Sequence, residues 1–221
     1  STNKDFKYQY PNVTAAGSWR TGGNLNNARR LGAGSGLQTA ALYFSGKTGP
    51  TTRVTNTEQY DGTSWTEVND VNTARQQLGG SGTQTSSLAY GGFIPPDSAA
   101  TESWNGTNWT EVNDLNDTRR MGGSLGADNT SALAFGGYTT AVVAVTELYN
   151  GTNWTEVNDL NTARTMLGAS GDATAGIAFG GTQDPPKTAA TELWNGTNWT
   201  EVNDLNTARD DLAGSGKGTT T

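Results

Sequence analysis

Residues 153–164 read NWTEVNDLNTAR, and residues 198–209 repeat this string without a change. Variants of it end at Arg29, Arg75 and Arg119, so successive arginines are separated by 46, 44, 45 and 45 residues. Ten residues before each arginine stands a tryptophan: Trp19, Trp65, Trp109, Trp154 and Trp199. The chain is therefore a repeat array. A period near 45 without long amphipathic stretches predicts the four-stranded blades of a β-propeller.

One unit, from Arg75 to Asn116, predicts four strands. Residues 77–82 are rich in small side chains, which suits an innermost strand, and residues 86–90 form an apolar second strand. Residues 101–104 and 109–112 predict the third and fourth strands, joined by a hairpin that contains Asn105-Gly106. Because Asn-Gly tolerates positive φ at both residues, we expect a type I′ turn there.

The same units carry a family pattern. An apolar run ends in a glycine pair, an aromatic residue follows, and a tryptophan comes five positions after it; the pairs are Gly91-Gly92, Gly136-Gly137 and Gly180-Gly181. This pattern resembles the Kelch repeat of β-propellers over roughly residues 17–216. More loosely, the units resemble repeats in fibre and surface proteins of marine bacteriophages. The Kelch resemblance implies the fold and says little about function, because this fold carries many functions.

Counting the markers predicts an all-β, five-bladed propeller in one domain over residues 1–221. Four blades are expected at residues 29–72, 73–116, 117–161 and 162–206, and a fifth is expected to combine residues 1–28 with residues 207–221. The apolar second strand is missing from the pattern of this split blade. Either the blade is defective or the natural chain continues.

Composition removes several classes of function. A formal charge of −7 and a pI near 4.5 disfavour nucleic acid as a partner, and no apolar run is long enough to insert into a membrane, so we expect a soluble protein. Without Cys or His there is no thiolate nucleophile, imidazole base or zinc finger. The inner strands also lack carboxylates, so we expect no enzyme, no cofactor and no metal.

The segments between the second and third strands differ completely from unit to unit. They span residues 47–56, 93–100, 138–145 and 182–190, and should share one face with the linkers between blades. One interpretation is a binding surface, whose candidate residues are Phe93, Ile94, Tyr138, Gln183, Asp184 and Lys187. The simpler alternative is drift in loops under little constraint.

The repeated polar and aromatic residues have structural interpretations beside functional ones. The arginine ring of Arg29, Arg75, Arg119, Arg164 and Arg209 could bind an anion. We instead expect each arginine to contact either carbonyls of the entry turn or a fourth-strand glutamate, namely Glu67, Glu111, Glu156 or Glu201. The aspartates Asp70, Asp114, Asp159 and Asp204 come singly, which favours turn formation over calcium binding. Trp104 and Trp194 could stack on sugars, but we expect core positions.

These observations favour a non-enzymatic binding module. The expected setting is extracellular or on a virion, with a host-surface glycan or protein as the partner and with other virion or fibre proteins as possible neighbours. The alternative is a rigid spacer in a fibre or scaffold, which has no ligand of its own.

Overall fold

The computed structural model describes residues 21–214, and within this range the fold is all-β. Strands form four antiparallel sheets of four strands each, and in every sheet the spatial order follows the chain. The first two sheets comprise β1 (Ala33–Leu37), β2 (Ala40–Phe44), β3 (Thr57–Tyr60), β4 (Trp65–Val68), β5 (Gly79–Gly82), β6 (Ser87–Tyr90), β7 (Thr101–Trp104) and β8 (Trp109–Val112). The last two comprise β9 (Gly123–Asp128), β10 (Ser131–Phe135), β11 (Thr146–Tyr149), β12 (Trp154–Val157), β13 (Gly168–Gly171), β14 (Gly176–Phe179), β15 (Thr191–Trp194) and β16 (Trp199–Val202).

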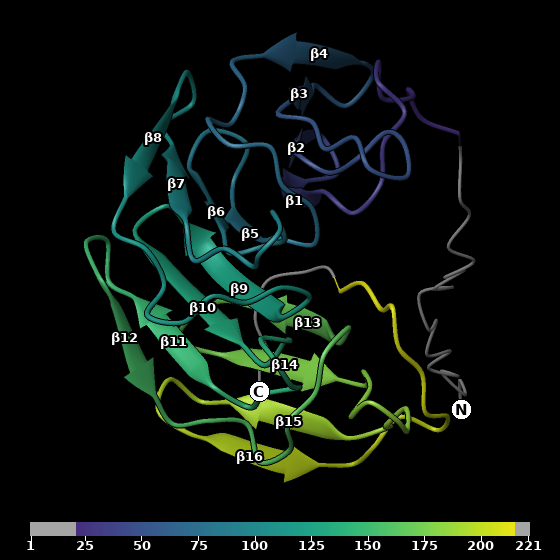
Figure 1. Cartoon of the computed structure of the whole chain (residues 1–221), viewed down its shortest axis with the longest axis vertical. Helices are drawn as coiled ribbons and strands as arrows, with labels where there is room; N and C mark the ends of the chain where they lie inside the picture. The colour runs from purple at the N-terminus through teal and green to yellow at the C-terminus, as the bar shows by residue number, and fades with distance from the viewer. Residues whose placement is uncertain (1–20, 215–221) are drawn as a thin grey trace, which may run out of the picture.

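The sheets are arranged as blades about a common centre (Figure 1). Strands β1, β5, β9 and β13 lie side by side at this centre, and β4, β8, β12 and β16 lie at the periphery. Just before each inner strand, the backbone N–H of Gln77, Met121 and Met166 donates to the carbonyl of the equivalent residue in the preceding blade, at 2.7, 2.9 and 2.9 Å. The result is a repeat fold of the β-propeller type.

The expectation of five blades in a closed ring is wrong for the described residues, which form four blades and leave the ring open. Residues 1–20 and 215–221, on which most of the split blade depends, lie outside the described range. Inside it, residues 209–214 begin a fifth unit without forming a strand. Leu212 packs against Gly168 and Gly180 of the fourth blade, and Gly181 donates to the Arg209 carbonyl at 2.8 Å.

Hydrophobic clusters lie between successive blades. The last aromatic residue of each second strand meets the fourth-strand tryptophan of the following blade: Phe44 with Trp109, Tyr90 with Trp154 and Phe135 with Trp199, with ring centroids 4.8, 4.9 and 4.7 Å apart. These interfaces explain the small residues of the inner strands. A methyl group on Gly80 would stand 2.8 Å from the ring of Phe44 and 2.8 Å from the Cβ of Ala33 in the preceding blade.

Two local predictions need correction. The hairpins at Asn105-Gly106, Asn150-Gly151 and Asn195-Gly196 are not type I′, because only the glycine of each pair has positive φ. The asparagine side chain instead accepts hydrogen bonds from the backbone N–H groups two and three residues later, as Asn105 does from Thr107 and Asn108. In addition, the inner strand of the second blade begins at Gly79 rather than Gln77, because Gln77 has φ 59°.

Candidate functional site

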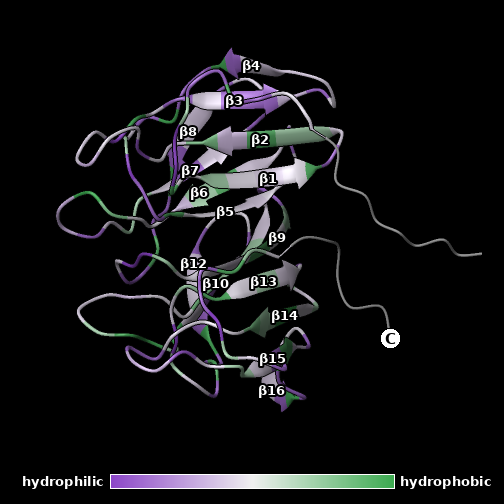
Figure 2. Ribbon diagram, turned by 90° about the vertical axis from the view of Figure 1, so that its right-hand side faces the viewer, coloured by the Kyte–Doolittle hydropathy of each residue, from purple (hydrophilic) through white to green (hydrophobic). Residues whose placement is uncertain are grey.

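One end of the molecule, which we call the loop face, carries both the variable loops and the linkers between blades. Isolated β-bridges pair Phe93 with Gln76, Tyr138 with Arg120 and Thr182 with Thr165, which joins each loop to the residue after the repeated arginine. The longer connections gather at one end of the sheets, and short turns close the other end (Figure 2). The prediction that variable loops and linkers share a face is therefore confirmed.

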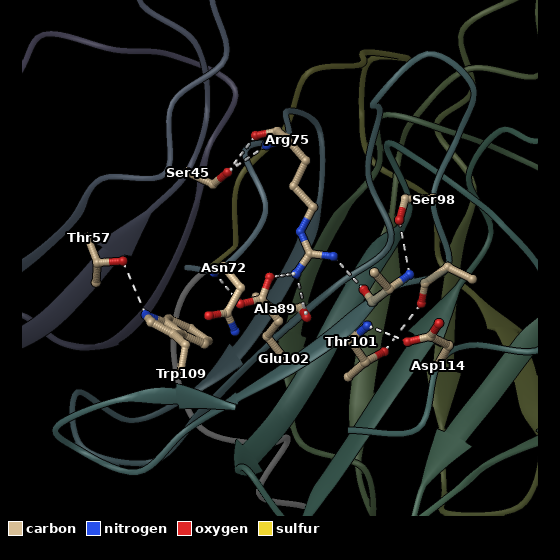
Figure 3. Close-up of polar contacts among 12 residues, drawn as sticks. Ser45, Thr57, Asn72, Arg75, Ala89, Ser98, Thr101, Glu102, Trp109 and Asp114 are labelled. Carbon is tan, nitrogen blue, oxygen red and sulfur yellow. Dashed lines mark hydrogen bonds and ion pairs between the residues drawn. The ribbon is translucent and has the colours of Figure 1, made fainter. Parts of the chain in front are cut away.

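Beneath the loop face, the arginine that opens each described blade is buried against a glutamate of the same blade. In the second blade, Nη2 of Arg75 lies 3.0 Å from Oε1 of Glu102, and its guanidinium also donates to the carbonyls of Ala100 and Ala89 at 2.5 and 3.2 Å (Figure 3). The backbone N–H of Asn72 donates to the other oxygen of Glu102 at 2.6 Å. The equivalent ion pairs are Arg29–Glu58, Arg119–Glu147 and Arg164–Glu192.

The glutamate in each pair belongs to the third strand, so the predicted pairing with the fourth-strand residues Glu67, Glu111, Glu156 and Glu201 is wrong. The fourth strand is the outer edge of its blade, where these four side chains are exposed. The third strand lies one position closer to the axis, and Glu102 there is 1% exposed. A guanidinium that enters from the linker therefore meets the third-strand carboxylate. Arg209 is exposed and forms no ion pair among residues 21–214.

Burial sets the electrostatics of these pairs. It lowers the pKa of Arg75 and Arg164, while the charges of Glu102 and Glu192 act in the opposite direction. Burial raises the pKa of Glu58, but hydrogen bonds from Asn26 and Arg29 and the charge of Arg29 outweigh it, so the pKa is lowered overall. In these pairs the guanidinium charge is already compensated inside the fold. The buried arginines are thus poorly placed to bind an external anion.

On the loop face, arginines from two blades stack on aromatic residues of the variable loops. The Cζ of Arg53 lies 4.9 Å from the ring centroid of Phe93, and the Cζ of Arg120 lies 4.9 Å from Phe93 and 4.7 Å from Tyr138. Nη1 of Arg120 is 2.5 Å from Oδ1 of Asp97. Two sequence-predicted site residues, Phe93 and Tyr138, are thus brought together through Arg120.

The other candidate residues lie outside this stack. Ile94 is half-buried, and its N–H donates to the Pro96 carbonyl. Gln183, Asp184 and Lys187 are exposed on the fourth blade's loop, and Nζ of Lys187 lies 2.6 Å from Oδ1 of Asp210. That hydrogen bond raises the pKa of Lys187. Within the described part of the chain, no ion pair or ring contact joins these residues to Phe93 or Tyr138.

Two cavities lie at opposite ends of the central axis. The one at the loop face has a volume of about 690 Å³ and is lined by equivalent residues of successive units, among them Leu31, Gln77, Met121, Met166 and Asp211. The cavity at the opposite end has a volume of about 200 Å³ and is lined by the turns after the inner strands, including Leu37, Thr83 and Asp172. Asp172 there accepts a hydrogen bond from the Thr174 N–H at 2.8 Å.

The remaining repeated residues have structural contacts, although the aspartates hold a strand rather than form the expected turns. Asp114 accepts from the N–H of Thr101 at 2.9 Å and so fixes the linker to the third strand, as its equivalents do. Trp104 and Trp194 are buried in the core. No group of three or more metal-binding side chains occurs among residues 21–214.

Sequence reasoning missed two sets of residues. The third-strand threonines Thr57, Thr101 and Thr146 accept from the indole N–H of Trp109, Trp154 and Trp199 in the following blade, at 3.2, 3.1 and 3.2 Å. Their recurrence at one position of every unit was the available signal. The stacked residues Arg53, Asp97 and Arg120 carried no repeat signal, because their positions vary between units.

No protein-family model matches this sequence, and no curated protein is similar to it at a significant level. The described residues contain no helix that is long and apolar enough to cross a membrane. The evidence for the fold is therefore the internal repeat together with the four blades, and the evidence for function is the loop face itself.

Proposed function

We propose that this chain is a non-enzymatic binding module that recognises its ligand through the loop face. One observation carries the proposal. Units that are nearly identical in their third and fourth strands differ completely in four loops, and these loops lie at the same end of the molecule. A constant scaffold with variable loops at one end is the usual arrangement of a binding protein.

We further propose that the blades are Kelch-like and that the same kind of linker precedes and follows each of them. Linkers at both ends of the described chain support this. The backbone N–H of Asn26 donates to Glu58 at 2.7 Å, as Asn72 does to Glu102, so the first blade is entered in the standard way. Asp211 has φ 53°, close to 54° at Met166 and 55° at Met121, so the chain leaves the fourth blade in the standard way too.

The setting we propose is extracellular or on a virion, where the module would act as an adhesin for a host-surface glycan or protein. Its support is the looser resemblance of the units to bacteriophage fibre and surface repeats. Absence of Cys and His from the sequence agrees with a role that needs no redox or imidazole chemistry.

A rigid spacer in a fibre or scaffold is the second candidate. It is favoured by the contacts that repeat between blades, because Asn69, Asn113 and Asn158 each donate to the hairpin of the next blade, at 2.9, 3.0 and 3.0 Å to a backbone carbonyl. Contacts of this kind stiffen a disc whether or not it carries a ligand.

Loop replacement separates the two candidates. Residues 93–100 can be exchanged for the sequence of residues 138–145 without a change in length, and the other two loops can be rebuilt on the same template. We expect the parent protein to bind members of an array of neutral and acidic glycans, and the variant with four identical loops to lose this binding while melting normally. Replacing hairpin 61–64 by NGTN, at the opposite end, is the matched control. Binding that survives loop replacement would refute recognition through the loops, and a parent protein that binds no glycan would favour the spacer.

A further inference from the structure

Among residues 21–214 of this acidic protein, the positive charges outside the buried ion pairs lie on the loop face. Outside the buried ion pairs, the cationic side chains of residues 21–214 are Arg30, Lys47, Arg53, Arg120, Lys187 and Arg209. All six belong to the variable loops or to the linkers beside them. At the opposite end, the charged residues of the described turns are acidic: Asp61, Asp128 and Asp172. Within the described range, an anionic ligand could therefore find cationic partners outside the buried ion pairs only on the loop face, where they lie among acidic residues of the loops and linkers.

The loop face is itself divided. On the side of the fourth blade, Lys187 is paired with Asp210, and Asp184 and Asp211 lie nearby in the chain. On the side of the first three blades, Arg30, Lys47, Arg53 and Arg120 form what we call the cationic patch. Asp97 is the acid in contact with it. Asp70, Asp114 and Asp117 lie in the adjoining linkers, and no ion pair joins them to the patch within the described range.

The patch is continuous across three blades. β-Bridges join Lys47 to Arg30 and to Arg53, and Nε of Arg53 donates to the Phe93 carbonyl at 3.1 Å. Arg120 then lies against both Phe93 and Tyr138. A guanidinium stacked on a ring uses its flat face, which leaves its N–H edges for oxyanions. Within residues 21–214, the terminal nitrogens of Arg53 and the whole guanidinium of Arg30 have no hydrogen-bond partner.

We propose that the cationic patch binds an anionic polysaccharide through its carboxylate or sulfate groups; this rests on the proposed binding role of the loop face. The charge of the patch is complementary to such a chain, and arginine edges suit planar and tetrahedral oxyanions. Phe93 and Tyr138 hold the arginines in place, so their rings serve as supports for guanidinium groups rather than as platforms for sugar stacking.

Two other anionic partners fit the patch less well. A protein partner needs apolar anchors at the centre of its interface. Between residues 21 and 214, the exposed large hydrophobic side chains are Leu31 and Leu37, which line the axial cavities instead. Single-stranded nucleic acid needs aromatic rings on which bases can stack, and the Phe93 ring is already contacted by two guanidinium groups. A charged sugar chain requires neither feature.

The test measures binding of the full chain to immobilised dextran sulfate, polygalacturonate and neutral dextran, with an acidic polypeptide and single-stranded DNA as further probes. We expect binding to the sulfated or the carboxylated polysaccharide and none to neutral dextran. The double variant Lys47→Gln with Arg53→Gln should lose at least roughly tenfold in affinity, because each charge-assisted contact contributes about that much. The control, Gln38→Glu with Thr66→Glu, makes the net charge more negative by the same two units at exposed positions away from the loop face, and its affinity should stay within about twofold of the parent.

Several outcomes overturn the proposal: equal losses in the two double variants, tighter binding of DNA or acidic polypeptide than of either polysaccharide, or no binding of either polysaccharide. The proposed function, recognition of a ligand through the loop face, is tested separately by loop replacement. It survives if any neutral glycan on the array binds in a manner that loop replacement abolishes, and it fails if no loop-dependent binding is found. Unchanged melting temperatures of both double variants exclude misfolding as the cause of a loss.

Discussion

Arg119 and Arg120 are neighbours in the chain, yet they belong to two different regions of the molecule. The side chain of Arg119 is 4% exposed and is paired with Glu147 inside the third blade. The side chain of Arg120 is 23% exposed and lies on the loop face between Phe93 and Tyr138. One arginine helps to hold the scaffold together, and the other belongs to the surface that varies.

Internal repetition distinguishes these two regions. The position of Arg119 is an arginine in all five units, whereas the next position reads Arg30, Gln76, Arg120, Thr165 and Asp210. A residue that every unit keeps makes the same contact in every blade, as Arg119 does. A residue that changes from unit to unit makes a contact that occurs in one blade only. Mutations in the first class should therefore affect stability, and mutations in the second class should affect binding.

The largest effect is expected for Arg119→Ala. It leaves the buried carboxylate of Glu147 without its partner, and breaking one side of a buried pair costs about 3 to 5 kcal/mol. Urea unfolding followed by tryptophan fluorescence measures the loss. The double variant Arg119→Met with Glu147→Leu is the control and should recover much of the stability, because it leaves no unpaired charge. A loss below about 1 kcal/mol for Arg119→Ala would contradict the scaffold role.

A buried tyrosine gives the next effect, and it appears only at high pH. Burial raises the pKa of Tyr90 to about 12, and the neighbouring hydroxyls of Ser124 and Ser81 act weakly in the opposite direction. Since the unfolded chain ionises near 10, this contribution to stability is complete below pH 10 and is lost as the pH rises to about 12. The loss amounts to roughly 3 kcal/mol. Tyr90→Phe should remove this part of the alkaline unfolding, and Tyr138→Phe on the loop face is the control. Identical alkaline profiles for Tyr90→Phe and the parent would contradict the prediction.

A smaller effect is expected at the contacts between blades. Thr101→Val keeps the shape of the side chain but removes the acceptor of the Trp154 indole N–H, which is buried. An unsatisfied buried donor costs about 1 to 3 kcal/mol. Thr155→Val, on the exposed fourth strand of the next blade, is the matched control and should be close to neutral. Equal unfolding midpoints for the two valine variants would show that the hydroxyl of Thr101 does not hold the blades together.

The third and fourth strands of the blades could be predicted from the sequence because their signals are local. Thr101–Trp104 and Trp109–Val112 have the predicted bounds, since alternation and the hairpin residues lie within a few positions of each other. The predicted type I′ conformation of the hairpin was wrong. The Asn105 side chain accepts hydrogen bonds from the N–H groups of the turn, which removes the need for positive φ at Asn105.

The candidate site depended more on tertiary structure and was predicted only in part. Placement of the variable loops on one face followed from repeat topology. Arg75 pairs with Glu102 rather than Glu111 because of the position at which the linker enters the blade. No local sequence pattern indicates that position. The stack of Arg53, Phe93, Arg120 and Tyr138 joins residues from three blades, so a single unit contains no trace of it.

The smallest effect on stability is expected for Arg120→Ala, the neighbour of the most damaging substitution. Its pair with Asp97 is partly solvated, and exposed ion pairs and cation–π contacts contribute about 0 to 1 kcal/mol each. The loop also keeps its backbone attachment, because Arg120 and Tyr138 exchange two main-chain hydrogen bonds of 3.0 and 2.9 Å that the substitution leaves intact. Urea unfolding should therefore place Arg120→Ala within about 1 kcal/mol of the parent, whereas its affinity for the anionic polysaccharide should fall. A loss of stability similar to that of Arg119→Ala would mean that the stack is part of the scaffold, and the distinction between the two arginines would fail.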